Sequence, residues 1–252
     1  MANKIQLMYY LNLLRLTFDT AIEPWQAPDF RAAVMDYLGW GYDGLPLPGE
    51  DGAQTTLAKE DSAGLPAHPY PYPLAQFKVR RNRGSYQPML LFLGPRSSEV
   101  REYFQSARNS AVVVNNRAYP LDIAEASLHR FRLKAGEEWF EYNLFKYQAL
   151  NNENHRRYQE LENEEQRLSF LEKLLASHIL TFARGVGWQV GAPVQVKGLH
   201  ILQEQELRCR GIRNHCFDLN FRCNLFLPEF IGLGRGVARG FGVLRLDRRG
   251  RN

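Results

Sequence analysis

The stretch HCFDLNFRCNLFLP, residues 215–228, restricts the fold of this chain more than any other, because apolar and polar side chains alternate along it. The apolar positions are Phe217, Leu219, Phe221, Cys223, Leu225 and Leu227, and the polar positions are Asp218, Asn220, Arg222 and Asn224. Successive side chains of a β-strand point to opposite faces, so the alternation predicts a long strand with one buried face. His215 and Cys223 share the apolar register, and core packing is expected for both.

The N-terminal half contains the signals for four strands and two helices. Strands are expected at 7–18, 74–80, 86–93 and 110–114, and helices at 28–39 and 97–107. The segment 42–73 is rich in proline and glycine and should be irregular. The resulting order, strand-helix-strand-strand-helix-strand, is the split βαβ pattern of a ferredoxin-like domain.

The C-terminal half repeats this order loosely. A strand at 138–147 precedes one long helix from about 153 to 182. The elements expected after it are strands around 192–202 and 207–211, the alternating strand, a short helical turn at 228–232 and a closing strand at 241–246. We therefore predict an α+β fold of two tandem ferredoxin-like (RRM-like) βαββαβ domains, residues 1–124 and 125–252.

Charge and cysteine content narrow the class of protein. The formal net charge of +5 is compatible with a polyanionic partner without requiring one. No apolar run reaches the roughly 18 residues of a membrane span and no signal peptide is evident, so a cytoplasmic protein without membrane contact is expected. Cys209, Cys216 and Cys223 match no zinc pattern, which favours reduced structural thiols.

Near the C-terminus stands GLGRGVARGFG, residues 232–242, in which five glycines surround two arginines. A nucleotide-binding P-loop ends in Gly-Lys-Ser/Thr, which this stretch lacks. A dinucleotide fingerprint lies between a strand and a helix, whereas these glycines lie between two predicted strands. NAD and ATP are therefore not expected, and no cofactor and no metal ion is predicted. Glycines that only relieve steric strain would not account for the interleaved arginines.

The spacing Gly-Leu-Gly, five residues, Gly-Phe-Gly resembles the glycine-rich signature of the RAMP proteins of CRISPR systems. The resemblance is strongest to the repeat-processing endoribonucleases, which cut CRISPR precursor transcripts. Further segments that look like this family, in the family order, are YPLAQFKV (72–79), YQALNNENHRRYQ (147–159), HILTFARGVGW (178–188) and the stretch 217–244. The resemblance thus covers most of residues 72–245.

The resemblance implies two tandem ferredoxin-like domains that bind a CRISPR repeat RNA across the face between them. It also implies cleavage of one phosphodiester without metal, as a step of antiviral defence. In such enzymes the glycine loop packs against the RNA, where backbone N–H groups approach a phosphate and arginines add charge-assisted contacts. The loop residues given this role are Gly232, Gly234, Arg235, Gly236, Arg239, Gly240 and Gly242.

Metal-free RNA cleavage uses the 2′-hydroxyl as nucleophile and leaves a 2′,3′-cyclic phosphate and a 5′-hydroxyl. It needs a base, an acid and positive charge at the phosphorane. In the family the catalytic histidine usually lies in or near the loop after the first helix, and His68 is the only histidine of this chain before residue 129. His68 is the predicted base or acid, and the alternative is that it is an exposed loop histidine without a catalytic role. Tyr42, Tyr70 and Tyr72 are predicted partners, the alternative being packing groups. Lys78 either contacts the phosphate or has a structural role in its strand.

Further RNA contacts are predicted at Arg80, Arg81, His129, Arg130, Arg184 and Lys197. The expected partners are repeat RNA and other CRISPR-associated effector or adaptation proteins. An alternative function from another class is a non-catalytic RAMP subunit that holds guide RNA in a larger complex. A general RNA-binding module is disfavoured, because no RNP1-like string with stacking aromatics occurs.

Overall fold

The computed structural model describes residues 9–39, 72–106, 110–209 and 211–248. Its strands are β1 (Tyr9–Phe18), β2 (Ala75–Asn82), β3 (Ser85–Leu93), β4 (Ala111–Val114), β5 (Arg117–Pro120), β6 (Ile123–Tyr147), β7 (Val196–Cys209), β8 (Ile212–Phe226) and β9 (Val243–Leu246). Its helices are α1 (Ala27–Tyr37), α2 (Ser97–Ser106), α3 (Asn152–Glu160) and α4 (Glu164–Gly185), with the 3₁₀ turns η1 (Pro24–Gln26) and η2 (Val237–Arg239). None of the described helices is both long and apolar enough to cross a membrane.

The N-terminal half is a four-stranded antiparallel sheet in the order β2-β3-β1-β6. Both helices cover the same face of it, because Phe18 of β1 packs against Phe30 of α1 and Phe104 of α2, each at a ring-centroid distance of 5.5 Å. The alternation of β1 turns Leu11 and Leu13 to the other face, where they join the core of the C-terminal half.

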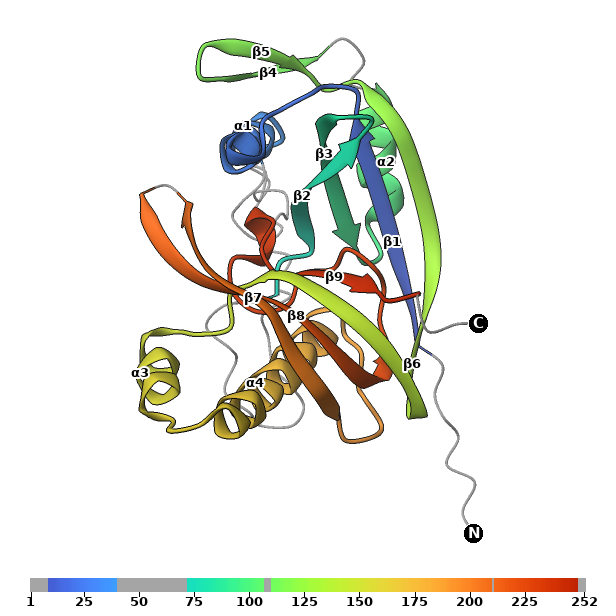
Figure 1. Ribbon diagram of the computed structural model, residues 1–252. Helices are drawn as coiled ribbons and strands as arrows, with labels where there is room; N and C mark the ends of the chain where they lie inside the picture. The colour runs from blue at the N-terminus through green and yellow to red at the C-terminus, as the bar shows by residue number, and fades with distance from the viewer. Residues whose placement is uncertain (1–8, 40–71, 107–109, 210, 249–252) are drawn as a thin grey trace, which may run out of the picture.

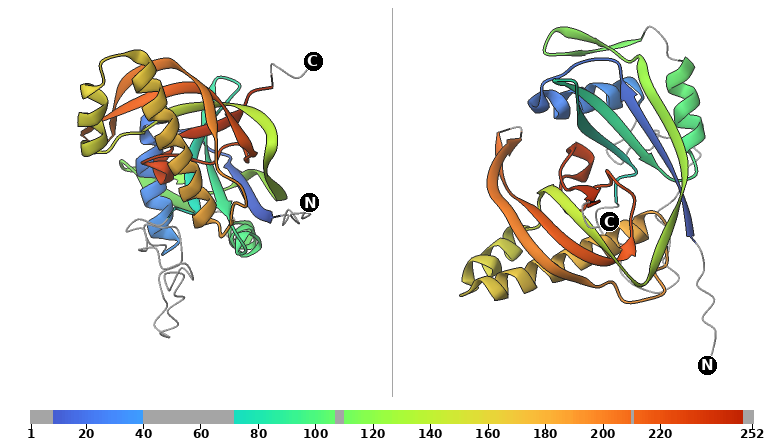
Figure 2. Two further views of the ribbon diagram at one scale, coloured as in Figure 1. Left: turned by 90° about the horizontal axis from the view of Figure 1, so that it is seen from below. Right: turned by 45° about the vertical axis from the view of Figure 1, so that its right-hand side comes forward.

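The strand β6 belongs to both halves of the molecule. Its first part pairs with β1, from Tyr9↔Leu133 to Phe18↔Ile123, and its second part pairs with β8 and β9. The second half therefore has the order β9-β6-β8-β7. Read from its last strand, the first half has the order β6-β1-β3-β2, so in both halves the strands lie in the order fourth, first, third, second. In Figure 2, right, β6 runs from one half into the other, and the loop with η2 lies between the halves.

Helix α4 covers the sheet of the C-terminal half (Figure 1). Its residues Leu171, Leu175, Ile179 and Phe182 are fully buried, as the apolar face predicted for this region requires. The alternating strand is confirmed as β8, with Phe217, Leu219 and Cys223 buried. The second helix of the repeat is reduced to the single turn η2.

Four details of the predicted elements are wrong. The stretch 110–114 is a strand, but it forms a separate hairpin with β5, and the fourth strand of the first sheet is the beginning of β6. The single helix predicted from 153 to 182 is two helices, because Asn163 caps α4 by accepting a hydrogen bond from the Gln166 amide. The strands expected at 192–202 and 207–211 are one strand, β7, and residues 228–232 form no helical turn.

His215 is also placed differently from the prediction. Its ring is partly exposed, and Nε2 lies 2.6 Å from Oε1 of Glu204 on the neighbouring strand. This polar contact holds the ring at the edge of the core. The predicted domain division after residue 124 falls two residues into β6, and we keep that division as a proposal.

Candidate functional site

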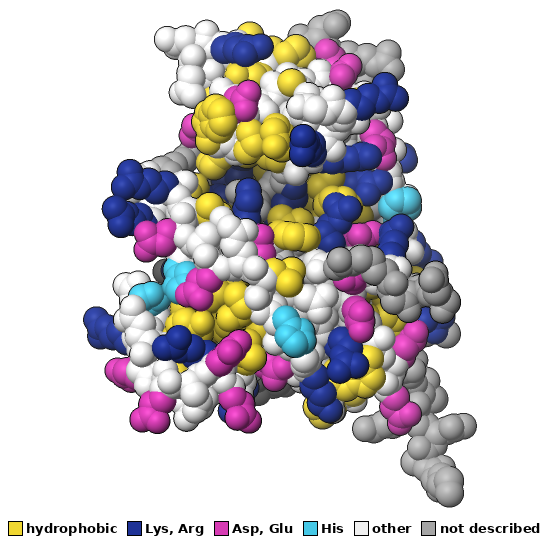
Figure 3. Space-filling view, in the orientation of Figure 1, with side chains coloured by type: hydrophobic (Ala, Val, Ile, Leu, Met, Phe, Trp, Pro, Cys, Tyr) yellow, Lys and Arg dark blue, Asp and Glu magenta, His cyan; other side chains and the backbone are white. Residues whose placement is uncertain are grey.

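A cleft of about 1270 Å³ opens between the two halves. We call it the basic cleft. One wall is formed by η1, the start of α1 and β2, and the other by β6, β7, η2 and β9. The space-filling view shows the molecule hollowed at this level, with Lys and Arg side chains gathered along the hollow (Figure 3).

Cationic side chains outnumber carboxylates in the lining of the basic cleft. The cations are Arg15, Lys78, Arg80, Arg81, Lys146, Arg208, Arg239, Arg245 and Arg248, and the carboxylates are Asp29 and Glu229. Glu229 is already paired with Arg245 at 3.4 Å and with Arg248 at 2.8 Å. A concave surface lined by one sign of charge focuses the electrostatic potential, so the cleft attracts an extended anion.

Aromatic rings lie among these cations. The Phe230 ring is contacted by the guanidinium carbons of Arg15, at 5.7 Å from the centroid, and of Arg245, at 4.0 Å. Trp25 and Phe145 also line the cleft and are exposed, with 73% and 39% of their surface accessible. Positive charge interleaved with exposed rings suits the alternating phosphates and bases of a single-stranded nucleic acid.

The glycine loop, residues 232–242, forms part of one cleft wall, and its backbone is packed too closely for side chains. Gly242 has φ +62°, and a Cβ there would lie 1.8 Å from the carbonyl oxygen of Leu233. Gly234 and Gly236 also have positive φ and would collide with Tyr147 and Phe241. Several loop amides donate to protein acceptors, including Gly242 to Lys146 and Arg235 to Gln148. The glycines therefore serve to compact the loop.

Three side chains at and before the start of β2 bind this loop from the other half of the molecule. We call Tyr72, Gln76 and Lys78 the β2 anchor. The Tyr72 hydroxyl donates to the Gly232 carbonyl at 2.9 Å, and the Gly232 amide donates to Oε1 of Gln76 at 2.9 Å. Nζ of Lys78 donates to the carbonyls of Val237, at 3.0 Å, and Phe241, at 3.4 Å. All three side chains are buried, so the loop and β2 are held together by directional bonds away from solvent.

Burial also changes the acidity of the anchor. It lowers the pKa of Lys78 to about 7 and raises the pKa of Tyr72. Burial therefore favours the neutral forms of both side chains.

Comparison with known proteins identifies the family. Residues 134–246 match the family model described as the Cas6b C-terminal domain. The uncharacterized protein MJ0978 of Methanocaldococcus jannaschii is 30% identical over 112 residues, which make up 42% of this chain and 75% of that relative. The chain belongs to the Cas6b family. The expected membership in a CRISPR-associated protein family is thereby confirmed.

Solved structures of Cas6b share the fold. A crystal structure of Cas6b superposes with a TM-score of 0.70 at 20% identity, covering 95% of this chain and 100% of that one. A second crystal structure, of the CRISPR RNA processing endoribonuclease Cas6b, gives a TM-score of 0.65 at 18% identity, again over 95% and 100% of the two chains. The predicted α+β fold with tandem ferredoxin-like halves is confirmed.

The structure brings some of the predicted site residues of this Cas6b chain together. Arg80, Arg81 and Arg239 line the basic cleft. His129 lies beside it, in a smaller pocket of about 260 Å³ that also contains Arg15 and Arg248. Lys78 lies beneath the glycine loop with 2% of its surface exposed, and it holds the loop by its hydrogen bond to the Val237 carbonyl. Its contact with a phosphate stays a prediction.

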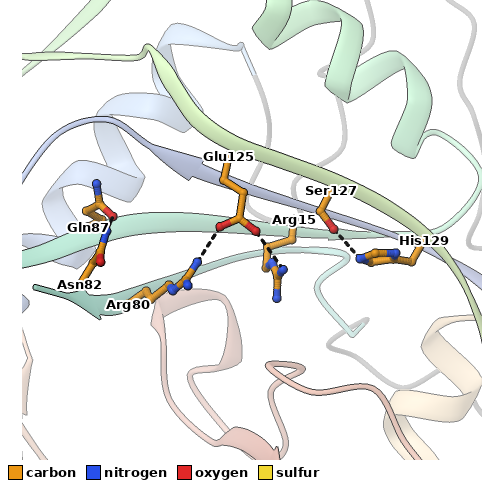
Figure 4. A network of polar contacts seen from close by, with 7 residues as sticks. All are labelled: Arg15, Arg80, Asn82, Gln87, Glu125, Ser127 and His129. Atoms are coloured by element: carbon orange, nitrogen blue, oxygen red, sulfur yellow. Dashed lines mark hydrogen bonds and ion pairs between the residues drawn. The ribbon is translucent and has the colours of Figure 1, made fainter.

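A polar network connects the cleft to β6 (Figure 4). Glu125 accepts from Arg80 at 2.7 Å and from Arg15 at 3.2 Å, so one carboxylate holds two arginines of the cleft side by side. The hydrogen bond from Arg80 is the main cause of the lowered pKa of Glu125. On the same strand, His129 Nε2 pairs with the Ser127 hydroxyl.

Other predicted residues lie elsewhere. Arg130 stacks on Tyr10 at 4.5 Å and Lys197 on Trp139 at 5.0 Å, and neither lines the cleft. Arg184 is exposed near the end of α4, and Arg235 is exposed on the glycine loop outside the cleft lining. Their contacts with RNA stay predictions. His68, Tyr42 and Tyr70 fall outside the described residues.

Several residues of the cleft were missed by reasoning from the sequence, among them Arg15, Trp25, Lys146 and Arg208. Arg15 had a signal, because it interrupts an otherwise apolar strand. Arg245 and Arg248 also line the cleft, and they belong to the arginine-rich C-terminal stretch that the sequence offers as a patch for nucleic acid. Within the described residues, no three His, Cys, Asp or Glu side chains are grouped closely enough to bind a metal ion.

Proposed function

We propose that this Cas6b-family protein binds CRISPR repeat RNA in the basic cleft and cuts one phosphodiester within the repeat without a metal ion. The observation that carries the proposal is the cleft itself, whose cations come from both halves and outnumber its carboxylates. Each phosphate neutralised by Lys or Arg releases condensed counterions, so such a lining favours a nucleic-acid backbone.

Arg239 is the loop residue best placed for a phosphate. It lines the cleft on η2, and its Nε hydrogen is buried without an acceptor among the described residues. A buried donor without a partner is costly, and a phosphate oxygen would satisfy it with a charge-assisted bond. Arg80 and Arg81 on the facing wall would contact the same strand of RNA.

The proposed chemistry uses the 2′-hydroxyl of the RNA as nucleophile. A base takes the 2′-proton, the 2′-oxygen bonds to phosphorus, and the bond to the 5′-oxygen breaks as an acid protonates that oxygen. The products are a 2′,3′-cyclic phosphate and a 5′-hydroxyl. We assign His68 one of the two proton transfers, with Tyr42 and Tyr70 as its partners, because the imidazole pKa lies near neutral pH. Arginines of the cleft would stabilise the charge of the phosphorane.

The test is incubation of the purified protein with end-labelled repeat RNA in EDTA, followed by mapping of the ends. Cutting at one site with a cyclic phosphate supports the proposal, provided that His68→Ala abolishes cutting while binding persists. His200→Ala, an exposed histidine of β7 outside the cleft lining, is the matched control and should cut normally.

The same experiment separates the alternatives. Binding by the unaltered protein without any cutting would favour the non-catalytic RAMP subunit. Cutting that survives His68→Ala would assign the chemistry to another residue. Other CRISPR-associated proteins as partners are part of the proposal and would be sought by co-purification.

A further inference from the structure

Trp25 is the most exposed large hydrophobic side chain among the described residues, with 73% of its surface accessible. It stands on η1, on the wall of the basic cleft formed by the N-terminal half. No ring–ring or cation–π contact to its indole is formed within the described part of the chain. The Phe230 ring, in contrast, is already covered by Arg15 and Arg245. Trp25 is thus a large free aromatic face in a cationic cleft.

The turn that carries Trp25 is fixed on both sides. Pro24 precedes it, and Gln26 follows it. The Glu23 amide donates to Oε1 of Gln26 at 2.8 Å, and the Gln26 amide donates to the Glu23 carbonyl at 2.9 Å. Nε2 of Gln26 also donates to the hydroxyl of the buried Tyr119 at 3.0 Å. The backbone is therefore held in place while the indole remains exposed, an arrangement that lowers the entropic cost of binding a ligand on the ring.

From this geometry we infer that Trp25 is a stacking site for one unpaired nucleobase of the RNA bound in the basic cleft. The inference rests on the proposed function, because it takes the occupant of the cleft to be RNA. The positive charge of the cleft favours RNA over an apolar protein segment. Such a segment would have to desolvate the surrounding arginines, whereas RNA presents an aromatic base and an anionic phosphate in each nucleotide. Stacking on an indole tolerates any base, so the site selects for an unpaired nucleotide more than for a sequence.

The test uses fluorescence anisotropy with a labelled oligoadenosine RNA and, separately, a fully paired hairpin RNA. Trp25→Ala should weaken binding of the single strand by about 5- to 150-fold, the range that corresponds to one stacked base. Trp25→Phe should recover much of that loss, since it restores an aromatic face. The slope of log affinity against log salt should not change in Trp25→Ala, because no phosphate contact is removed.

Tyr103→Ala is the matched control, because Tyr103 is also an exposed aromatic residue but lies outside the cleft lining. It should bind both probes like the unaltered protein. The stacking site is wrong if Trp25→Ala binds the single strand normally, if it weakens the paired hairpin equally, or if it changes the oligomeric state by sedimentation instead of RNA affinity. Failure of the unaltered protein to bind either RNA would instead overturn the proposed function.

Discussion

Nζ of Lys78 on β2 donates a 3.0 Å hydrogen bond to the carbonyl oxygen of Val237, which lies in the glycine loop of the other half. Lys78 is 2% exposed, so this bond forms away from bulk water. The loop wall of the basic cleft is thus attached to the sheet of the N-terminal half by a titratable group. The free energy of unfolding of the protein should therefore depend on pH.

The free energy of unfolding should rise with pH through the Lys78 titration. The folded pKa, about 7, is below the unfolded value of 10.5, so between these values the unfolded chain binds more protons. The contribution of Lys78 to the free energy of unfolding is therefore greatest above the unfolded pKa of 10.5, and it is lost as the pH falls to and through the folded pKa of about 7. The expected slope is at most about 1.4 kcal/mol per pH unit.

Urea denaturation between pH 7 and pH 9 would measure this effect. Lys78→Met should reduce the slope, and subtraction of the two curves cancels the contributions of the other titrating groups, which the two proteins share. Lys146→Met, which removes an exposed lysine of the same cleft, is the control and should keep the slope. Equal slopes in the unaltered protein and Lys78→Met would show that burial of Lys78 does not control stability.

Gly242→Ala should destabilise the fold by more than a matched glycine substitution elsewhere. Gly242 and Gly39 both have φ +62°, but a Cβ at Gly242 would meet the Leu233 backbone, whereas a Cβ at Gly39 would meet no atom of the described residues within 4 Å. Gly39→Ala should therefore show only the backbone strain of about 1–2 kcal/mol, and Gly242→Ala that strain plus displacement of the loop. Thermal denaturation of both variants measures the difference, and equal losses would contradict close packing as the reason for this glycine.

Tyr72→Phe should weaken the attachment of the glycine loop. Its hydroxyl donates to Gly232 and accepts from Gln76, and both contacts are buried. Removal leaves buried polar groups unpaired, at a cost of about 1–3 kcal/mol. Tyr37→Phe removes an exposed hydroxyl that bonds Ser110 at 2.7 Å and should cost much less. Chemical denaturation of the two variants compares the costs, and a smaller loss for Tyr72→Phe would argue against the β2 anchor.

Arg208→Gln should weaken RNA binding and lower its salt dependence. Arg208 lines the basic cleft from β7, and removal of one phosphate contact reduces the slope of log affinity against log salt by about 1. Arg96→Gln is the control, since Arg96 is exposed, pairs with Glu99 and lies outside the cleft lining. Titrations at several salt concentrations measure both slopes. A lower slope in Arg96→Gln alone would place the RNA path outside the basic cleft.

Much of the fold could be predicted because β8 and α4 each have a clear apolar face. The beginning of β6 could not, since residues 123–132 include no buried side chain and so show no alternation. The Val-rich stretch 110–114 suggests the fourth strand instead, because β-branched residues favour strands wherever they occur. The glycine loop was found from its spacing, whereas Trp25, Lys146 and Arg208 come from separate segments that only the folded chain brings to one cleft.

The shared strand has a consequence for any attempt to separate or exchange the two halves. Because β6 completes the sheet of one half and begins that of the other, there is no flexible tether at which they could be divided. Division after residue 124, for example, would remove most of the strand that pairs with β1 and leave the edge of β1 bare, which is a template for aggregation. A graft or exchange of the first half must therefore carry β6 as far as Leu133.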